Sequence, residues 1–188
     1  MAQAVREIEG VELPPAGKYE LDITHTQVEF VARHMLTKLR GRFTEFEGTI
    51  VVGDDIDSSS VEVEIKVDSV QTNTEQRDDH LRGADFFEVE SFPVLTFEST
   101  GIRHTGGNAF ELDGDLTVKG TTKPVTLNGE YLGWGQDPYG NTIFSASVAT
   151  EINREDWDLT WNVAVETGGF LVGKKVGIEI DVEARKVG

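Results

Sequence analysis

The side chains best suited to chemistry lie in the stretch from Thr74 to Phe97, where Arg77, Asp78, Asp79 and His80 occupy consecutive positions. An imidazole beside two carboxylates could exchange protons with a small substrate, His80 acting together with Asp78 or Asp79. In a second interpretation, Arg77 and Asp78 pair with neighbouring groups and only hold a short helix in place. In a third, Arg77 or His80 reaches the mouth of a cavity and binds the polar head group of a ligand. The sequence leaves these three roles open.

Other catalytic and metal-binding motifs do not occur in the sequence. The chain contains no cysteine, which excludes disulfides and thiolate chemistry. Its four histidines do not stand at the spacing of a metal-binding pair. They are His25, His34, His80 and His104. There is no Gly-x-Ser-x-Gly turn and no phosphate-binding glycine loop. We therefore predict no metal, no cofactor and no enzymatic activity.

The stretch from Thr74 onward interrupts a chain that otherwise alternates in the manner of β-strands. A short helix is predicted between Thr74 as its N-cap and Gly83 as its terminator, because acidic residues fill the first turn. Phe86 and Phe87 then form a second turn, and Phe92 precedes a proline that favours extended backbone. We interpret the rings, the histidine and the arginine gathered here as the mouth of an apolar cavity.

The remaining residues predict an all-β fold. The clearest alternation places Val61, Val63, Ile65 and Val67 on one face and charged residues on the other. About eight to ten such segments, separated by turn signals, are typical of a sandwich or a barrel. We predict an antiparallel, eight-stranded, extended barrel with one or two short helices. The barrel domain should span residues 18–188 after a flexible leader at 1–17, and one helical turn is expected within residues 33–41.

Inward-facing side chains of such a barrel either fill it or line a tunnel, and the alternation alone does not distinguish the two. If a tunnel exists, its wall is predicted to consist of aromatic and aliphatic residues from the strands and from the interruption. These residues are Phe30, Phe43, Phe46, Val63, Ile65, Val67, Leu81, Phe86, Phe87, Phe92, Phe97, Leu116 and Val118. Arg77 and His80 would then hold the head group of the ligand.

The charge of the chain bears on its partners. The 188 residues carry 34 acidic and 17 basic side chains, a formal net charge of -17. Such a surface repels phosphate groups, so nucleic acid and anionic membrane faces are disfavoured. No run approaches the roughly 18 apolar residues of a membrane span, so stable membrane insertion is not expected. The N-terminus lacks a signal-peptide pattern, and we expect a cytoplasmic protein.

Several motifs, in the same order, resemble the YceI-like family of polyisoprenoid-binding proteins with a lipocalin-like barrel. The resemblance covers residues 17–187. The motifs that carry it are DITHTQVEFVARHM with GRF (22–35 and 41–43), RDDHL (77–81), DFF (85–87), FPVLTFES (92–99), GDLTVKGTTKPV (114–125) and INR (152–154).

The resemblance implies an elongated antiparallel barrel whose apolar pore holds a long isoprenoid chain, and frequently a homodimer. We therefore predict that the chain binds a long-chain polyisoprenoid lipid, of the quinone or polyprenyl type, as a carrier or store. Two alternatives remain: a small-molecule enzyme using His80 with Asp78 or Asp79, and an interaction domain whose barrel is filled by its own side chains.

Overall fold

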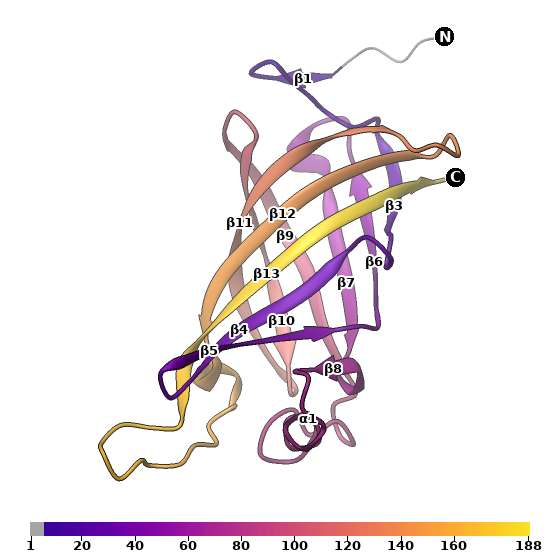
Figure 1. Cartoon of the computed structure of the whole chain (residues 1–188). Helices are drawn as coiled ribbons and strands as arrows, with labels where there is room; N and C mark the ends of the chain where they lie inside the picture. The colour runs from indigo at the N-terminus through magenta and orange to yellow at the C-terminus, as the bar shows by residue number, and fades with distance from the viewer. Residues whose placement is uncertain (1–5) are drawn as a thin grey trace.

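The computed structural model describes residues 6–188 and consists almost wholly of antiparallel strands (Figure 1). The strands are β1 (Glu7–Ile8), β2 (Val11–Glu12), β3 (Gly17–Leu21), β4 (Gln27–His34), β5 (Thr37–Phe43), β6 (Phe46–Val52), β7 (Ser60–Lys66), β8 (Val70–Gln71), β9 (Val94–Gly106), β10 (Ala109–Val118), β11 (Thr121–Gln136), β12 (Thr142–Asn153) and β13 (Val172–Val187). The helices are α1 (Glu75–Arg82) and the 3-10 turns η1 (Ile56–Ser58), η2 (Val67–Ser69) and η3 (Arg154–Trp157).

Eight strands close into a ring, in the order β12, β11, β10, β9, β7, β6, β3 and β13, and the pairing of β13 with β12 completes it. Every pairing in the ring is antiparallel. Closure removes the unpaired edges that an open sheet would expose. The predicted eight-stranded antiparallel barrel is therefore confirmed, with one α-helix in the described part of the chain.

Strand β13 has one pairing partner along one of its edges and two along the other. Along one side it pairs with β12 from Lys175 to Arg185. Along the other it pairs first with β4, from Val172 to Asp181, and then with β3, from Ala184 to Val187. Strands β4, β5 and β8 therefore form a branch outside the ring at the lower end of Figure 1, while β3 closes the upper end. The wall of the barrel is thus extended at its lower end by the strands of the branch.

The branch begins at the turn between β3 and β4, which is fastened to β13. Thr26, which is only 5% exposed, exchanges two hydrogen bonds with the backbone of Glu183 through its hydroxyl. Asp22 accepts bonds from the amide and hydroxyl of Thr24, at 2.9 and 2.6 Å. His25 Nδ1 lies 3.1 Å from Asp22 Oδ2 and 3.4 Å from Glu183 Oε1. These contacts fix the point at which the second edge of β13 passes from one partner to the other.

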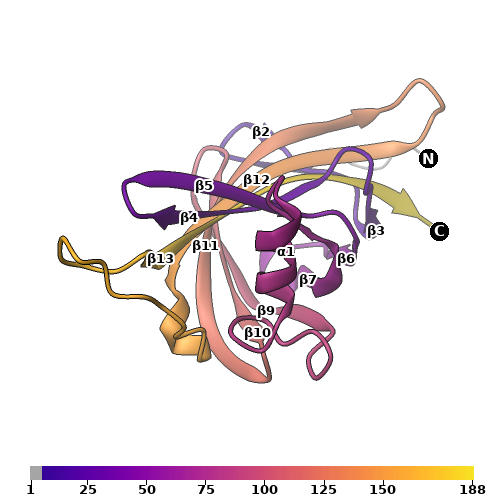
Figure 2. The same cartoon turned by 60° about the horizontal axis from the view of Figure 1, so that its bottom comes forward.

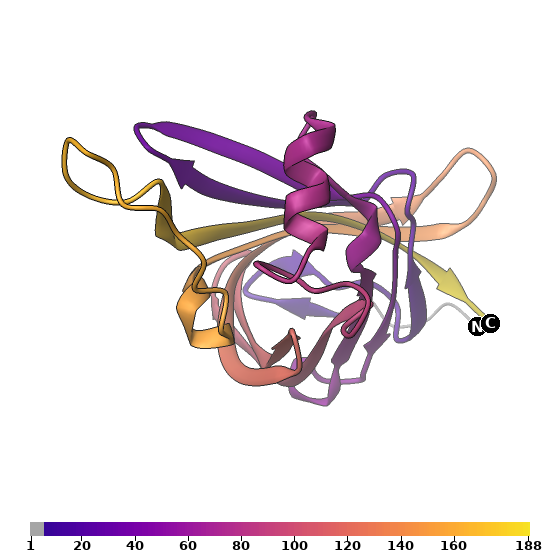
Figure 3. The same cartoon turned by 90° about the horizontal axis from the view of Figure 1, so that it is seen from below.

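Helix α1 lies across the lower end of the barrel (Figures 2 and 3). It runs between Thr74 and Gly83 as the sequence predicts, although the Thr74 side chain makes no capping hydrogen bond. Asp78 is buried and accepts bonds from the amide and hydroxyl of Thr72, so it fastens the helix to the chain that follows β8. No helix in residues 6–188 has the length and apolar character needed to cross a bilayer.

The segment 33–41 differs from its prediction. It contains no helical turn; instead it carries the tight connection between β4 and β5, where His34 pairs with Thr37 around Met35 and Leu36. Met35 takes a left-handed backbone conformation (φ 53°), which the sequence does not signal because glycine or asparagine usually fills that position. The prediction therefore missed a hairpin that projects from the barrel.

Part of the predicted leader is structured. Residues 1–5 lie outside the described part of the chain, while β1 and β2 form a small hairpin above the upper end (Figure 1). Arg6 donates hydrogen bonds to the carbonyls of Gly53, Asp54 and Pro14, and the Tyr19 hydroxyl donates to Pro15 O at 2.8 Å. The hairpin is therefore tied to the rim of the barrel.

We predict that Asp22→Asn lowers the pKa of His25 towards 6.5, because the hydrogen bond that His25 donates to the Asp22 carboxylate is the main cause that raises it. The hydrogen bond from the Thr24 side chain, followed by that from His25, lowers the pKa of Asp22 to about 2. The stabilisation from His25 is present below its unfolded pKa of about 6.5 and is lost as the pH rises through the folded pKa. That from Asp22 is present above pH 3.8 and is lost as the pH falls towards 2. NMR titration of both groups tests this; an unchanged His25 pKa in the variant would contradict the pairing.

Candidate ligand-binding cavity

A cavity of about 720 Å³ runs through the barrel from the N-terminal hairpin to α1. This volume lies within the range of about 300 to 1,000 Å³ that is usual for small-molecule sites. Alternate residues of the strands form its wall, and nearly all of them are aliphatic or aromatic. The central part is lined by Val61, Val63, Phe97, Phe110, Leu112, Leu127, Val148, Ile178 and Ile180. The filled-barrel alternative is therefore wrong.

Ten of the thirteen residues predicted for the wall line the cavity. They are Phe30, Phe43, Val63, Ile65, Leu81, Phe86, Phe87, Phe97, Leu116 and Val118. The other three, Phe46, Val67 and Phe92, do not belong to the wall. Val67 falls in η2, beyond the end of β7, and is buried in the protein core, where Phe46 packs beside it. Phe92 lies over Gly120 in the turn between β10 and β11.

Three phenylalanine rings lie flat along the wall because the position beneath each is a glycine. A Cβ atom on Gly41 would stand 2.1 Å from the ring of Phe30, its partner across the strands. Gly129 stands in the same relation to Phe110. The ring of Phe97 covers Gly114 diagonally, since Gly114 pairs with Ser99 in the register. A Cβ atom at any of these positions would force the ring above it to move, since real Cβ atoms essentially never stand closer than 3.0 Å to another atom. The glycines therefore keep the rings out of the lumen.

At the lower end, the contacts of Arg77 and Asp78 are internal to the protein. Arg77 Nε donates to Thr72 Oγ1 at 2.7 Å, and a second guanidinium nitrogen donates to Thr72 O. Asp78 accepts from the same threonine. These bonds correspond to the structural interpretation of the pair. Arg77 nevertheless contributes to the cavity wall, so one residue takes part in both the helix anchor and the wall.

His80 also lines the lower end, and its carboxylate partner is neither Asp78 nor Asp79. Nε2 of His80 lies 2.9 Å from Oδ2 of Asp85, while Asp79 pairs with Arg82. The predicted pairing for acid-base chemistry is therefore wrong in its partners. The imidazole packs edge-on against Phe86 and Trp161, with ring centroids 5.1 and 4.6 Å apart.

Trp161 belongs to the connection between η3 and β13, which Arg154 holds in place. The Arg154 side chain is only 3% exposed and donates hydrogen bonds to the carbonyls of Leu159, Trp161, Val172 and Gly173. Burial lowers the pKa of this guanidinium. The sequence analysis used the motif INR (152–154) only for the family resemblance and did not predict that this arginine organises a loop at the cavity mouth.

The upper end contains a polar group that the sequence analysis did not single out. The hydroxyl of Tyr131 is buried and has no hydrogen-bond partner among residues 6–188, and Tyr131 lines the cavity. Burial raises the pKa of its phenol far above the ordinary value. The alternation of β11 could have placed Tyr131 on the inner face, but the lack of a partner depends on the closed upper end, where Arg6, Leu13 and Pro14 cover the lumen.

One group of potential metal ligands exists in the described residues, and it lies apart from the cavity. Atoms of Asp22, His25 and Glu183 lie within 4.8 Å of one another on the outside of the β3–β4 turn. His25 is 62% exposed at its side chain, and the three groups already bond to one another. Their arrangement is explained by the anchoring of that turn to β13.

Comparison with known proteins points to one family. Residues 19–184 match the family model of the YceI-like domain. A UPF0312 protein of Staphylococcus aureus strain N315 is 34% identical over 169 residues, covering 88% of this chain and 95% of the relative.

Solved structures share the fold. BcnA of Burkholderia cenocepacia has a TM-score of 0.75 at 23% identity, covering 87% of this chain and 98% of its own. A domain from Saccharophagus degradans, described as polyisoprenoid-binding, has a TM-score of 0.67 at 15% identity, covering 92% of this chain and all of its own.

We predict that Gly41→Ala weakens binding of an apolar ligand roughly tenfold, because the added methyl group forces the Phe30 ring into the lumen and overpacking of this kind costs about 1 to 3 kcal/mol. Titration with a fluorescent polyene lipid measures the change. Gly101→Ala is the matched control, since nothing lies within 4 Å of its added Cβ.

Adding Phe30→Leu to Gly41→Ala should restore binding, because the smaller side chain leaves space for the methyl group. Wild-type affinity in the single Gly41→Ala variant would show that the flat ring does not set the width of the cavity.

Proposed function

The chain belongs to the YceI-like domain family, and we propose that it binds one long-chain polyisoprenoid lipid, of the quinone or polyprenyl type, in the barrel cavity, as its carrier or store. The observation that carries the proposal is the cavity itself: one elongated space of about 720 Å³ with an almost wholly apolar wall. The solved domain described as polyisoprenoid-binding, which has the same fold, supports this choice of ligand class.

Apolar burial alone supplies enough affinity for such a ligand. Each methylene group removed from water contributes about 0.8 kcal/mol, so several isoprene units bind tightly without polar contacts. The wall offers branched aliphatic side chains, such as Val63, Ile178 and Ile180, between the flat rings of Phe97 and Phe110. A flexible, methyl-branched chain can fit between such groups, whereas a rigid polar molecule would lose its hydration without compensation.

The two ends suggest an orientation for the ligand. At the lower end Arg77 and His80 supply donors beside the lumen, and they are our candidates for the head-group contacts. At the upper end the Tyr131 hydroxyl is the buried polar atom available to the ligand. The hairpin that carries Arg6 covers that end, so the chain of the lipid points upward and its head group lies at the α1 end.

The surroundings of His80 favour binding over catalysis. The imidazole is packed between Phe86 and Trp161, and Asp85, its partner, is itself half exposed. A general base usually needs a third group that orients it beside a substrate. One structural neighbour, the Saccharophagus degradans domain, is likewise described as polyisoprenoid-binding. Assembly as a homodimer stays a prediction.

We predict that Ile65→Glu abolishes retention of the lipid. Ile65 lines the cavity, and an ionised carboxylate there would cost several kcal/mol on contact with an apolar chain, a loss of more than about a hundredfold in affinity. Native mass spectrometry of the purified protein, followed by organic extraction, detects and identifies the bound species.

Val51→Glu is the matched control, because Val51 is 40% exposed on the neighbouring strand and does not line the cavity. Circular dichroism establishes that both variants fold. Equal retention in a folded Ile65→Glu variant, or a wild-type protein that stays free of ligand after incubation with polyprenyl lipids, would refute the proposed function.

A further inference from the structure

Two neighbouring segments at the lower end expose apolar side chains. Leu36 and Met35, at the tip of the β4–β5 hairpin, are 90% and 48% exposed, and Phe170 and Val163, in the connection before β13, are 61% and 47% exposed. The two segments are bonded together, since Met35 N donates to Leu171 O at 2.8 Å and His34 pairs with Val172. Figures 2 and 3 show them side by side. We call these four residues, together with the basic residues Arg33, Lys38, Arg40 and Arg42 of the hairpin, the tip surface.

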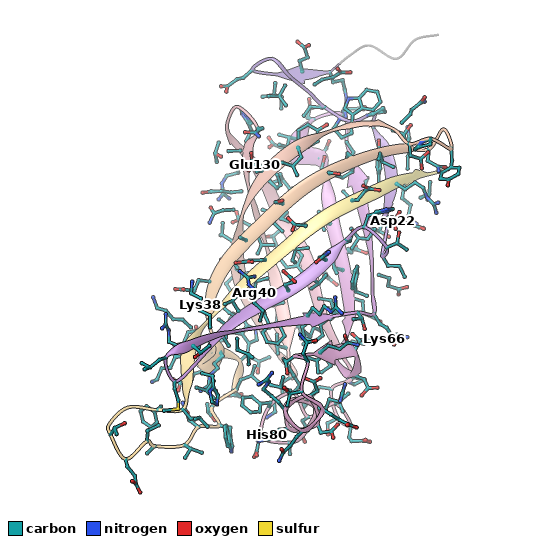
Figure 4. All side chains as sticks on the ribbon, in the orientation of Figure 1. Asp22, Lys38, Arg40, Lys66, His80 and Glu130 are labelled. Carbon is teal, nitrogen blue, oxygen red and sulfur yellow. The ribbon has the colours of Figure 1, made fainter. Side chains whose placement is uncertain are left out.

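The hairpin carries positive charge in a chain that is otherwise strongly acidic. Between Phe30 and Thr44 the sequence has Arg33, Lys38, Arg40 and Arg42 and no acidic residue. Arg40 is neutralised by Glu179, at 2.6 Å, but within residues 6–188 the other three bases have no carboxylate within 4 Å. Figure 4 shows Lys38 and Arg40 on the outer side of the hairpin.

The arrangement of these bases is unfavourable for the isolated protein. Arg33 and Lys38 stand directly opposite each other in the register of β4 and β5. Like charges at such positions destabilise a hairpin. An anion that lies against both side chains would remove this repulsion. Two acidic residues lie nearby, Glu29 opposite Arg42 in the register and the exposed Glu166 between Val163 and Phe170. The bases outnumber them, so the charges fit an anionic partner that covers the outside of the hairpin.

The tip surface adjoins the lower end of the cavity. Arg33, His34, Leu171 and Val172 line the cavity and belong to the same two segments. Trp161, which packs on His80, also stands in the connection that carries Phe170. A partner that covers the tip surface thus meets the end of the barrel where the head group of the proposed ligand lies.

We propose that the tip surface docks on the face of a lipid bilayer that contains anionic lipids. Leu36 and Phe170 enter the boundary between head groups and acyl chains, and Arg33, Lys38 and Arg42 contact the phosphates. This docking brings the lower end of the cavity to the membrane, where a long-chain lipid can enter or leave. The transfer of lipid between membrane and cavity rests on the proposed function, whereas the docking itself needs no bound ligand.

Charge decides between a bilayer and a second copy of the chain. In a twofold-symmetric dimer each surface meets itself, so the bases of one tip surface would face those of the other. A bilayer offers many phosphates to the same bases. The net charge of -17 does not prevent this contact, because charges more than about 8 Å from the membrane are largely screened at physiological ionic strength. The net charge therefore disfavours anionic membrane faces for most of the protein surface, but not for this basic hairpin.

Cosedimentation with vesicles tests the proposal. The protein is first freed of bound lipid by organic extraction and refolded. Vesicles of phosphatidylcholine alone are compared with vesicles that also contain phosphatidylglycerol, at low and high salt. We expect binding to the anionic vesicles, weakened by salt. Lys38→Gln and Arg42→Gln should each weaken it roughly fivefold, and the double variant Leu36→Ser, Phe170→Ser at least about tenfold.

Matched controls lie at the other end of the barrel. Leu132→Ser removes an apolar side chain that is 58% exposed, and Lys18→Gln removes a base that is 54% exposed; both should bind as the wild type does. Absence of binding, or equal binding by tip-surface and control variants, would overturn the proposal. So would a change from dimer to monomer in Leu36→Ser, Phe170→Ser, measured by light scattering, with vesicle binding unchanged.

Ligand retention is measured separately on the same variants by native mass spectrometry. Because Leu36, Lys38, Arg42 and Phe170 do not line the cavity, these variants should retain lipid as the wild type does. Loss of vesicle binding with retention intact supports docking at the tip surface. A wild-type protein that retains lipid but does not bind vesicles overturns the docking alone, and one that binds vesicles but retains no lipid overturns the proposed function alone.

Discussion

The architecture depends on one strand that forms hydrogen bonds with three others. The 16 residues of β13 pair with β12 along one edge and are divided between β4 and β3 along the other. An eight-stranded ring with every edge paired would have a nearly uniform bore. Because the second edge of β13 changes partner near Glu183, the upper half closes through β3 while the lower half continues into a branch. The site and the tip surface both follow from this division, since the branch supplies Phe30, Phe43 and the projecting hairpin.

A second condition keeps the barrel hollow. Eight-stranded barrels are narrow enough for their own side chains to fill them, and this barrel has ample rings to do so. The rings of Phe30, Phe97 and Phe110 lie along the wall because glycines stand beneath them. Valine and isoleucine then cover the rest of the wall with short side chains. Pairs of phenylalanine and glycine on adjacent strands thus keep the lumen open. The alternation of the sequence alone does not reveal this pattern.

The sequence predicted those features that depend on neighbouring residues. Helix α1 and the inward face of Val63 and Ile65 were correct, because capping signals and a period of two act over a few positions. The errors concern features set by distant contacts. Val67 alternates as a wall residue should, but β7 ends at Lys66 and the chain turns into the core. Phe46, at the start of β6, packs against the same core cluster. The partner of His80 was wrong because the turn after α1, not the helix itself, brings Asp85 to the imidazole.

The composition of the wall also determines how the protein can select a ligand. A hydrophobic pocket distinguishes ligands that differ by one methylene only by about 1 to 3 kcal/mol, and it cannot strongly reject a near-isosteric analogue. Selection must then come from the size of the cavity and from its two polar ends. The flat rings set the width, and the hairpin tied down by Arg6 sets the length. For the lipid that we propose as ligand, a cavity built in this way discriminates by chain length more strongly than by chemistry.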